Sequence, residues 1–333
     1  MELEWAKNII KMATDISKYV RKHTIIYASL RRNQQHILKK TISLQLPVAT
    51  RWTSHMNCLR SVNKSKAALQ ACVVEPQIAD TMRQDHQAEL RTTILADQTW
   101  TQLEDVITLL QPFLAVILDL EKDVPRLSWV YRHYSQLRLH AQSTFVSGLP
   151  IGKQVKKFVV GRWNWLRRPV MSVAYVLDPH MAPFGYPGEI LKEVGIFLEK
   201  YYDEKQSALI YSQICALVSR QEPFDTGILW RSAPLTPPIT WWTANFKNSC
   251  PELTKLAIRI LSMPASAASS ERNWSAFNFI HSASRNRLLN RKVQKLINIY
   301  WNSRLLTDVQ DDGTYFDEEE LEDEGIIDLS LFS

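Results

Sequence analysis

The chain has 333 residues, of which 45% are hydrophobic and 22% charged, an ordinary composition for a soluble globular protein. This length can bury one large core or two smaller ones. No apolar run approaches the ~20 residues of a membrane helix, and the opening Met-Glu-Leu-Glu-Trp lacks the layout of a secretory signal, so we expect no membrane partner.

Charge is distributed unevenly along the chain. The net charge is +6, but eleven of the 34 acidic residues lie between Asp308 and Asp328, where Lys and Arg are absent. The first 306 residues therefore carry 40 basic and 23 acidic residues, a formal charge of +17. A basic body of this size suits a polyanion such as DNA, or is simply a solvated basic surface. Residues 307–333 are predicted to be a disordered acidic tail.

Helical periodicity begins in the first segment, where apolar residues recur at spacings of three and four: Trp5, Ile9, Met12, Ile16 and Tyr19. A second long helix is predicted with Asp97 as its cap, kinked or divided at Pro112. A third is predicted at about 188–202. A capping box of Ser249 and Glu252 is predicted to open a fourth helix, which runs through 253–260.

Only residues 43–51 are typical of a strand. Leu44, Leu46 and Val48 alternate with other side chains, and Pro47 restricts the segment to an edge strand or an irregular one. The four cysteines, at positions 58, 72, 215 and 250, form no Cys-x-x-Cys pair. The histidines show no spacing suited to zinc. We therefore expect reduced core thiols in an intracellular protein and no metal site.

The most informative stretch is residues 263–275, Met-Pro-Ala-Ser-Ala-Ala-Ser-Ser-Glu-Arg-Asn-Trp-Ser. Six small residues precede Glu271, Arg272 and Trp274. Small residues let a helix approach another backbone closely, and the hydroxyl of Ser266 can cap that helix. Trp241-Trp242 and the apolar segment 250–261 precede this stretch, while Arg-Asn-Arg-Leu-Leu at 285–289 and Leu-Ile-Asn-Ile-Tyr-Trp-Asn at 296–302 follow it.

In this order and spacing, these motifs resemble the C-terminal dimerisation region of the hAT transposase superfamily. Residues 46–54, Leu-Pro-Val-Ala-Thr-Arg-Trp-Thr-Ser, are similar to the segment that precedes the family's helical insertion. Weaker similarity covers residues 100–131 and 163–180. The resemblance implies a mainly α fold, in which an incomplete ribonuclease H-like domain with one edge strand is interrupted by a large all-helical insertion.

The implied domains are a residual ribonuclease H-like segment at 1–60, the helical insertion at 61–239, the dimerisation region at 240–306 and the acidic tail at 307–333. Nine apolar residues of the C-terminal region are expected to pack against the insertion and a partner subunit. They are Leu253, Leu256, Ile260, Trp274, Phe277, Leu288, Leu296, Ile299 and Tyr300.

The resemblance also implies a catalytic requirement for two aspartates and one late glutamate. Three carboxylates hold two Mg²⁺ ions about 4 Å apart, which together clamp the attacking and leaving oxygens of a phosphodiester. Glu271 matches the glutamate, and the aspartates are expected before the segment that residues 1–40 match. We therefore expect no enzyme activity, and no cofactor unless Mg²⁺ binds with aspartates supplied from elsewhere. Glu271 is then a vestigial third carboxylate, or simply an acid that a helix N-terminus favours.

Basic residues near these motifs are candidate DNA contacts. They are Arg51 with Trp52, Arg272, and the helical group Arg285, Arg287 and Arg291. Phosphate contacts of this kind depend steeply on salt and carry no sequence specificity. Each has an alternative: a core position for Trp52, a salt bridge for Arg272, and a solvated basic face for the helical group.

These features lead to one hypothesis and two alternatives. The hypothesis is a catalytically incomplete, nuclear protein derived from an hAT transposase, which acts by dimerising with itself or with a related hAT-type protein and binds DNA non-specifically. The first alternative is a fragment of an active DNA transposase whose metal-binding aspartates are encoded upstream. The second is a domesticated DNA-binding or protein-interaction factor.

Overall fold

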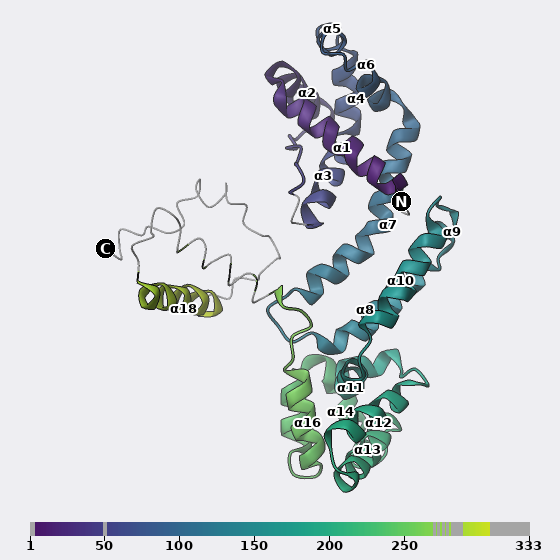
Figure 1. The fold of residues 1–333 in the computed structure, drawn as a ribbon, viewed down its shortest axis with the longest axis vertical. Helices are drawn as coiled ribbons and strands as arrows, with labels where there is room; N and C mark the ends of the chain where they lie inside the picture. The colour runs from purple at the N-terminus through teal and green to yellow at the C-terminus, as the bar shows by residue number, and fades with distance from the viewer. Residues whose placement is uncertain are drawn as a thin grey trace. The chain divides into compact units, whose positions relative to one another are not determined.

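The computed structural model describes residues 4–48, 52–268, 271, 274, 277, 280 and 289–306. Within these residues every regular element is a helix (Figure 1). None of the helices described is long and apolar enough to cross a membrane. The chain divides into two compact units, the first formed by residues 1–117 with 132–167 and the second by 118–131 with 168–333. The predicted domain boundaries at 60 and 239 stay predictions.

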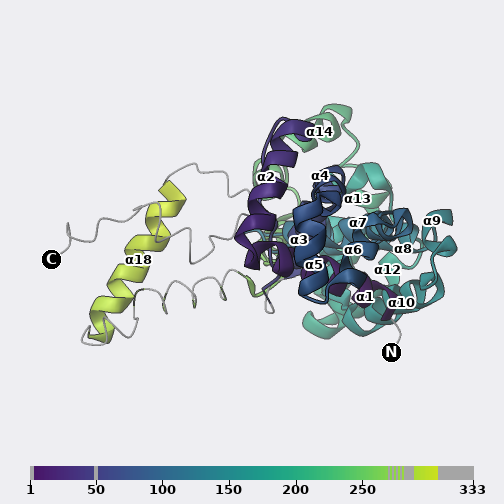
Figure 2. The same ribbon diagram turned by 90° about the horizontal axis from the view of Figure 1, so that it is seen from above.

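The first unit is built from short helices joined by tight connections. In it α1 packs against α3 and α2 against α4 (Figure 2). The periodicity predicted for the first helix is confirmed, since Ile9 and Ile16 of α1 are buried. The helices are α1 (Glu4–Lys22), α2 (Thr24–Leu38), α3 (Trp52–Lys64), α4 (Lys66–Val74), α5 (Pro76–Gln84), α6 (Ala88–Leu95), the first part of α7 (Asp97–Leu120), most of α8 (Leu127–Ala141), α9 (Thr144–Gly148) and α10 (Gly152–Leu166).

The strand predicted at 43–51 is wrong as far as the structure describes it. Residues 41–48 have no regular secondary structure, and 49–51 lie outside the described residues. The side chain of Gln34, fully buried on α2, takes the place of a neighbouring strand: its Oε1 accepts the Ile42 N–H at 3.0 Å and its Nε2 donates to the Ile42 carbonyl at 2.9 Å. Likewise the Gln45 N–H donates to Ser61 Oγ, and Arg21 donates to the Leu44 carbonyl. Because side chains satisfy these backbone groups, the segment needs no ladder.

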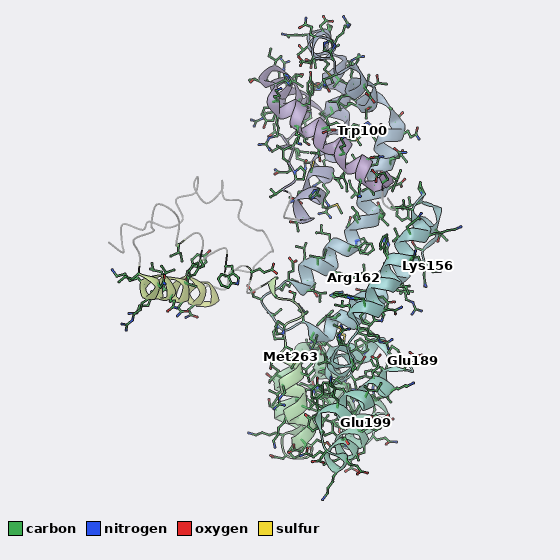
Figure 3. All side chains as sticks on the ribbon, viewed as in Figure 1. Trp100, Lys156, Arg162, Glu189, Glu199 and Met263 are labelled. Carbon is green, nitrogen blue, oxygen red and sulfur yellow. The ribbon has the colours of Figure 1, made fainter. Side chains whose placement is uncertain are left out.

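Helix α7 begins at Asp97, as the sequence predicted, but Asp97 lies in the first turn rather than at the cap. A carboxylate there still interacts favourably with the helix dipole. The helix continues through Pro112, so it is not divided into two. Trp100 (Figure 3) is buried, and its indole donates to the Ile94 carbonyl at 2.8 Å, which ties the start of α7 to the end of α6.

The second unit is also helical. In it α11 is buried at every position from 172 to 177 because α12, α13 and α16 all pack against it. Helix α12 confirms the helix predicted at about 188–202. The elements are α11 (Pro169–Leu177), η1 (Pro179–Phe184), α12 (Ile190–Tyr201), α13 (Glu204–Val218), α14 (Gly227–Ser232), η2 (Ala233–Leu235), α15 (Pro238–Phe246), α16 (Pro251–Leu261) and α18 (Asn290–Leu306).

All four cysteines are free thiols, as expected, and three of them are buried. Burial raises the pKa of Cys58, Cys72 and Cys250. A raised pKa keeps a thiol protonated and therefore slow to react. These cysteines accordingly act as small apolar core residues.

The buried Gln34 gives the first testable prediction. Gln34→Met keeps the side-chain length but orphans the Ile42 N–H and carbonyl, so we expect the free energy of unfolding to fall by about 2–4 kcal/mol. Gln35→Met, on the exposed side of α2, is the matched control and should change it by less than about 0.5 kcal/mol. Urea unfolding followed by circular dichroism measures both, and equal stabilities of the two variants would contradict this role of Gln34.

Candidate dimerisation region

Five aromatic side chains form one cluster in the second unit: Phe224, Trp230, Trp241, Trp242 and Phe246. The Trp241 and Trp242 rings meet edge to face at 5.3 Å between centroids, and Phe246 lies 5.0 Å from one and 5.4 Å from the other. Phe224 contacts Phe246 at 4.6 Å. Tilted and edge-to-face rings at these distances attract one another beyond the effect of burial alone.

Each tryptophan of the cluster also donates its indole N–H to a backbone carbonyl. Trp242 donates to Leu177 at 2.7 Å, Trp241 to Leu229 at 3.1 Å, and Trp230 to Phe224 at 2.7 Å. Trp241 and Trp242 are almost completely buried, so these bonds satisfy donors that would otherwise be costly to bury. The cluster therefore fixes α15 against the end of α11 and against α14, which contains Leu229.

Helix α16 follows the cluster and turns its apolar face inward. Leu253, Leu256 and Ile260 are at most 2% exposed, and the Thr254 hydroxyl donates to the Phe246 carbonyl at 3.0 Å. The capping box predicted at Ser249 is wrong, because Cys250 holds the N-cap position without a side-chain hydrogen bond and Pro251 opens the helix. Proline suits that position, since it has no N–H to leave unpaired.

The segment that contains the aromatic cluster and α16 matches a known family region. The model of the hAT family C-terminal dimerisation region matches residues 224–303. The chain carries an hAT dimerisation region. The match begins at Phe224, upstream of the boundary that the sequence led us to expect at 240. No curated protein matches the chain. The density of aromatic residues from 224 to 246 was the signal that could have placed Phe224 and Trp230 in this region.

Beyond α16, the dimerisation region continues through a turn at Ser266. The Ser266 hydroxyl accepts the Ala268 N–H at 3.4 Å, which agrees with its predicted capping role, and it donates to the Leu120 carbonyl at 3.0 Å. Glu271 is helical and exposed, and its N–H donates to the Ala267 carbonyl at 3.0 Å. Among the residues described, no three His, Cys, Asp or Glu side chains are grouped so that they could hold a metal ion.

The remaining apolar residues of the predicted strip divide into two sets. Phe277, Leu296 and Tyr300 are partly buried around a small cluster formed by Ile280 and by Val293 and Ile297 of α18. Trp274 and Ile299 are exposed, at 67% and 55%. Leu289, just before α18, is also exposed, at 72%. Leu288 lies outside the described residues. The dimerisation region thus has a core of its own and an apolar surface besides.

The predicted DNA contacts are only partly described. Arg291 is exposed on α18, next to the exposed Lys292 and Lys295. Trp52 is the first residue of α3, but its side chain is outside the description. Arg51, Arg272, Arg285 and Arg287 also lie outside the described residues, so their roles stay predictions.

Asp178 is a buried carboxylate that the sequence analysis did not single out as a site residue. Asp178, at the end of α11, is 2% exposed; it accepts hydrogen bonds from Ser128 Oγ at 2.6 Å and from the His180 N–H at 2.9 Å. Burial raises its pKa. The His180 ring contacts the Ala233 and Thr236 carbonyls through Nε2, at 3.0 and 3.1 Å. These contacts connect η1 to η2, and so give Asp178 and His180 a structural role.

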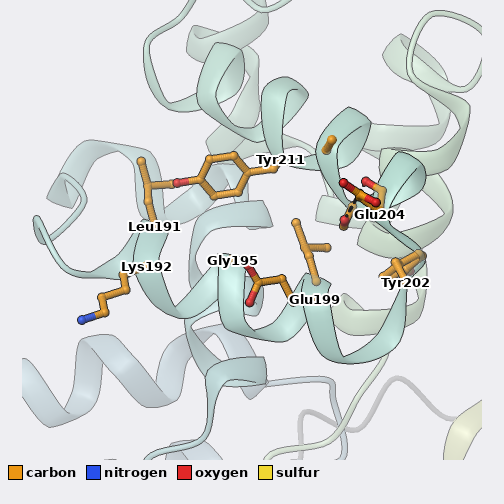
Figure 4. Close-up of a pocket in the computed structure, with 10 residues that line it drawn as sticks. Leu191, Lys192, Gly195, Glu199, Tyr202, Glu204 and Tyr211 are labelled. Atoms are coloured by element: carbon orange, nitrogen blue, oxygen red, sulfur yellow. Dashed lines mark hydrogen bonds between the residues drawn. The ribbon is translucent and has the colours of Figure 1, made fainter.

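A shallow groove of about 560 Å³ lies between α12 and α13 (Figure 4). Its lining includes charges of both signs, from Lys192, Glu199 and Glu204. Gly195 lines it, and a Cβ there would be in ordinary van der Waals contact with the Tyr211 ring, at 3.8 Å. The groove lies outside the matched region.

The indole hydrogen bonds can be tested with Trp242. Trp242→Phe leaves the Leu177 carbonyl unpaired and creates a small void, so we expect it to lower the free energy of unfolding by about 2–4 kcal/mol. The same substitution at Trp165, which is 62% exposed on α10, is the control and should cost less than about 0.5 kcal/mol. Denaturant unfolding of the two variants decides the matter; similar losses at both sites would show that the buried indole bond contributes little.

Proposed function

We propose that this chain is a catalytically incomplete protein derived from an hAT transposase and that it acts by dimerising through the surface around Trp274, Leu289 and Ile299. The match of residues 224–303 to the family's dimerisation region carries the proposal. The partner is a second copy or a related hAT-type chain.

The burial pattern supports this choice of surface. Leu253, Leu256 and Ile260 fill the core of the second unit and have little area left for a partner. Trp274 and Ile299 expose most of their side chains, and their burial against a partner would be favourable. Tryptophan in particular contributes strongly to binding when it enters a desolvated interface.

Replacement of exposed apolar side chains with glutamate tests this surface. Trp274→Glu and Ile299→Glu should each weaken the dimer by about 30-fold or more, because a carboxylate would be buried without a partner. Leu139→Glu, at a residue 69% exposed on α8, is the matched control and should leave association unchanged. Sedimentation equilibrium at micromolar concentrations measures the dissociation constants. A wild-type chain that is monomeric there, or variants that dimerise normally, would contradict the proposal.

The proposal includes the absence of nuclease activity. Glu271 is the family-type carboxylate, and the described residues offer no group of ligands to complete a two-metal site. The alternative function is a fragment of an active transposase. It differs only in that metal-binding aspartates encoded upstream would complete the site. We extend the proposal to non-specific DNA binding and a nuclear location, since the basic body and the exposed Arg291, Lys292 and Lys295 suit a polyanion.

Nicking of supercoiled DNA tests the catalytic part. The purified chain should leave the plasmid intact with Mg²⁺ or Mn²⁺, and Glu271→Gln should behave identically, because one carboxylate cannot hold two ions. Metal-dependent nicking that Glu271→Gln abolishes would refute the proposal. The Glu271→Gln preparation also controls for contaminating nucleases, because nicking by a contaminant would persist in it.

A further inference from the structure

One acid-free part of the chain runs from 124 to 177, between Asp123 and Asp178. Its portion within the first unit, residues 132–167, contains seven Lys and Arg residues and no Asp or Glu. A net positive segment of this length attracts polyanions whatever its detailed structure. Helix α10 lies near the end of this segment and carries four of the seven cations: Lys153, Lys156, Lys157 and Arg162.

One narrow stripe of α10 holds the helix in the unit. Val155, Val159 and Trp163, at spacings of four, are buried. The Trp163 ring stacks on Tyr134 of α8, with 4.0 Å between centroids and 6° between planes. All other α10 side chains except the half-buried Gln154 are exposed, so the helix presents a broad outer face.

Two aromatic rings and an arginine follow one another along this outer face. Phe158 is 48% exposed and Trp165 is 62% exposed. Arg162 lies between them, one turn after Phe158, and its guanidinium carbon is 4.3 Å from the centroid of the Trp165 ring. At 1.5 Å per residue, the two aromatic positions are about 10 Å apart along the helix.

Lys157 lies beside this aromatic stripe, whereas Lys153 and Lys156 lie on the other side of the helix, in line with Val160. Lys153, Lys156 and Lys157 are exposed, and no carboxylate of the described part of the chain forms an ion pair with them (Figure 3 marks Lys156 and Arg162). Gly161 lies between the aromatic stripe and Lys157, and a Cβ at Gly161 would meet nothing within 4 Å. The centre of the outer face is therefore open to a flat ligand.

We propose that the outer face of α10 binds single-stranded nucleic acid. Unpaired bases stack on Phe158 and Trp165, and Lys157 and Arg162 contact the phosphates. Exposed aromatic rings beside cations are the combination that binds single strands without sequence preference, because every base has a π face. The site lies outside residues 224–303 and does not depend on dimerisation.

The arrangement favours a single strand over the two other polyanionic partners. A duplex hides the faces of its bases, so it can use the lysines but not the rings. A membrane surface requires one continuous apolar stripe, whereas the exposed Val160 lies on the side of α10 away from Phe158 and Trp165. Two aromatic rings with a cation between them suit a strand that alternates bases with phosphates.

Fluorescence anisotropy with labelled oligothymidine and oligouridine of about 16 nucleotides tests the proposal on the full chain. We expect both to bind more tightly than a duplex of the same length, with affinity that falls as salt rises. The pair also distinguishes DNA from RNA. The double variant Phe158→Ala/Trp165→Ala should weaken single-strand binding by about 10- to 100-fold, while Trp165→Phe should retain most of it. Tyr201→Ala, at a residue 62% exposed on α12, is the aromatic control.

Gly161 provides a second test that does not remove any side chain. Gly161→Glu and Gly161→Lys both favour the helix over glycine, so both should fold, as circular dichroism can verify. Only the glutamate should abolish binding, because it places a negative charge at the centre of the face. The proposal is overturned if the wild type binds no oligonucleotide at low salt, if Gly161→Glu and Gly161→Lys bind alike, or if the chain binds phosphatidylserine vesicles and not the oligonucleotides.

Discussion

The hydrogen bonds from buried indoles to backbone carbonyls are the constraint on which the C-terminal region depends. Trp242 reaches the carbonyl of Leu177, 65 residues earlier, and Trp241 reaches that of Leu229 in α14, so α15 is bonded to both α11 and α14. A buried indole N–H has no inexpensive alternative to its partner. The two tryptophans therefore fix the direction of α15, and through Phe246 and Thr254 they fix the packing of α16.

This fixed packing decides how the apolar residues of the region are used. Once α16 lies against α11, α13 and α15, its leucines and isoleucine belong to the core of the second unit. The apolar surface that is left lies further along the chain, at Trp274, Leu289 and Ile299. In the proposed dimer, the inner part of the region stabilises the chain and these exposed side chains offer area to a partner.

The sequence predicted the elements whose signal is local. The 3.6-residue periodicity placed α1, α7, α12 and α16, and the motifs from 241 to 302 identified the family of the C-terminal region. The strand at 43–51 could not be rejected from sequence, because its alternation of apolar residues resembles a strand whichever groups satisfy its backbone. Here a glutamine on another helix satisfies it. The division of the apolar strip was also beyond prediction, since it depends on tertiary contacts of Trp241 and Trp242.

Hydrogen–deuterium exchange at a series of protein concentrations tests this division most directly. The account predicts that amides of α16 exchange slowly at every concentration, because they lie inside the second unit. Amides of α18 should gain protection only as concentration rises and the partner covers Ile299 and its neighbours. The opposite pattern, with concentration-dependent protection in α16 and none in α18, would contradict it.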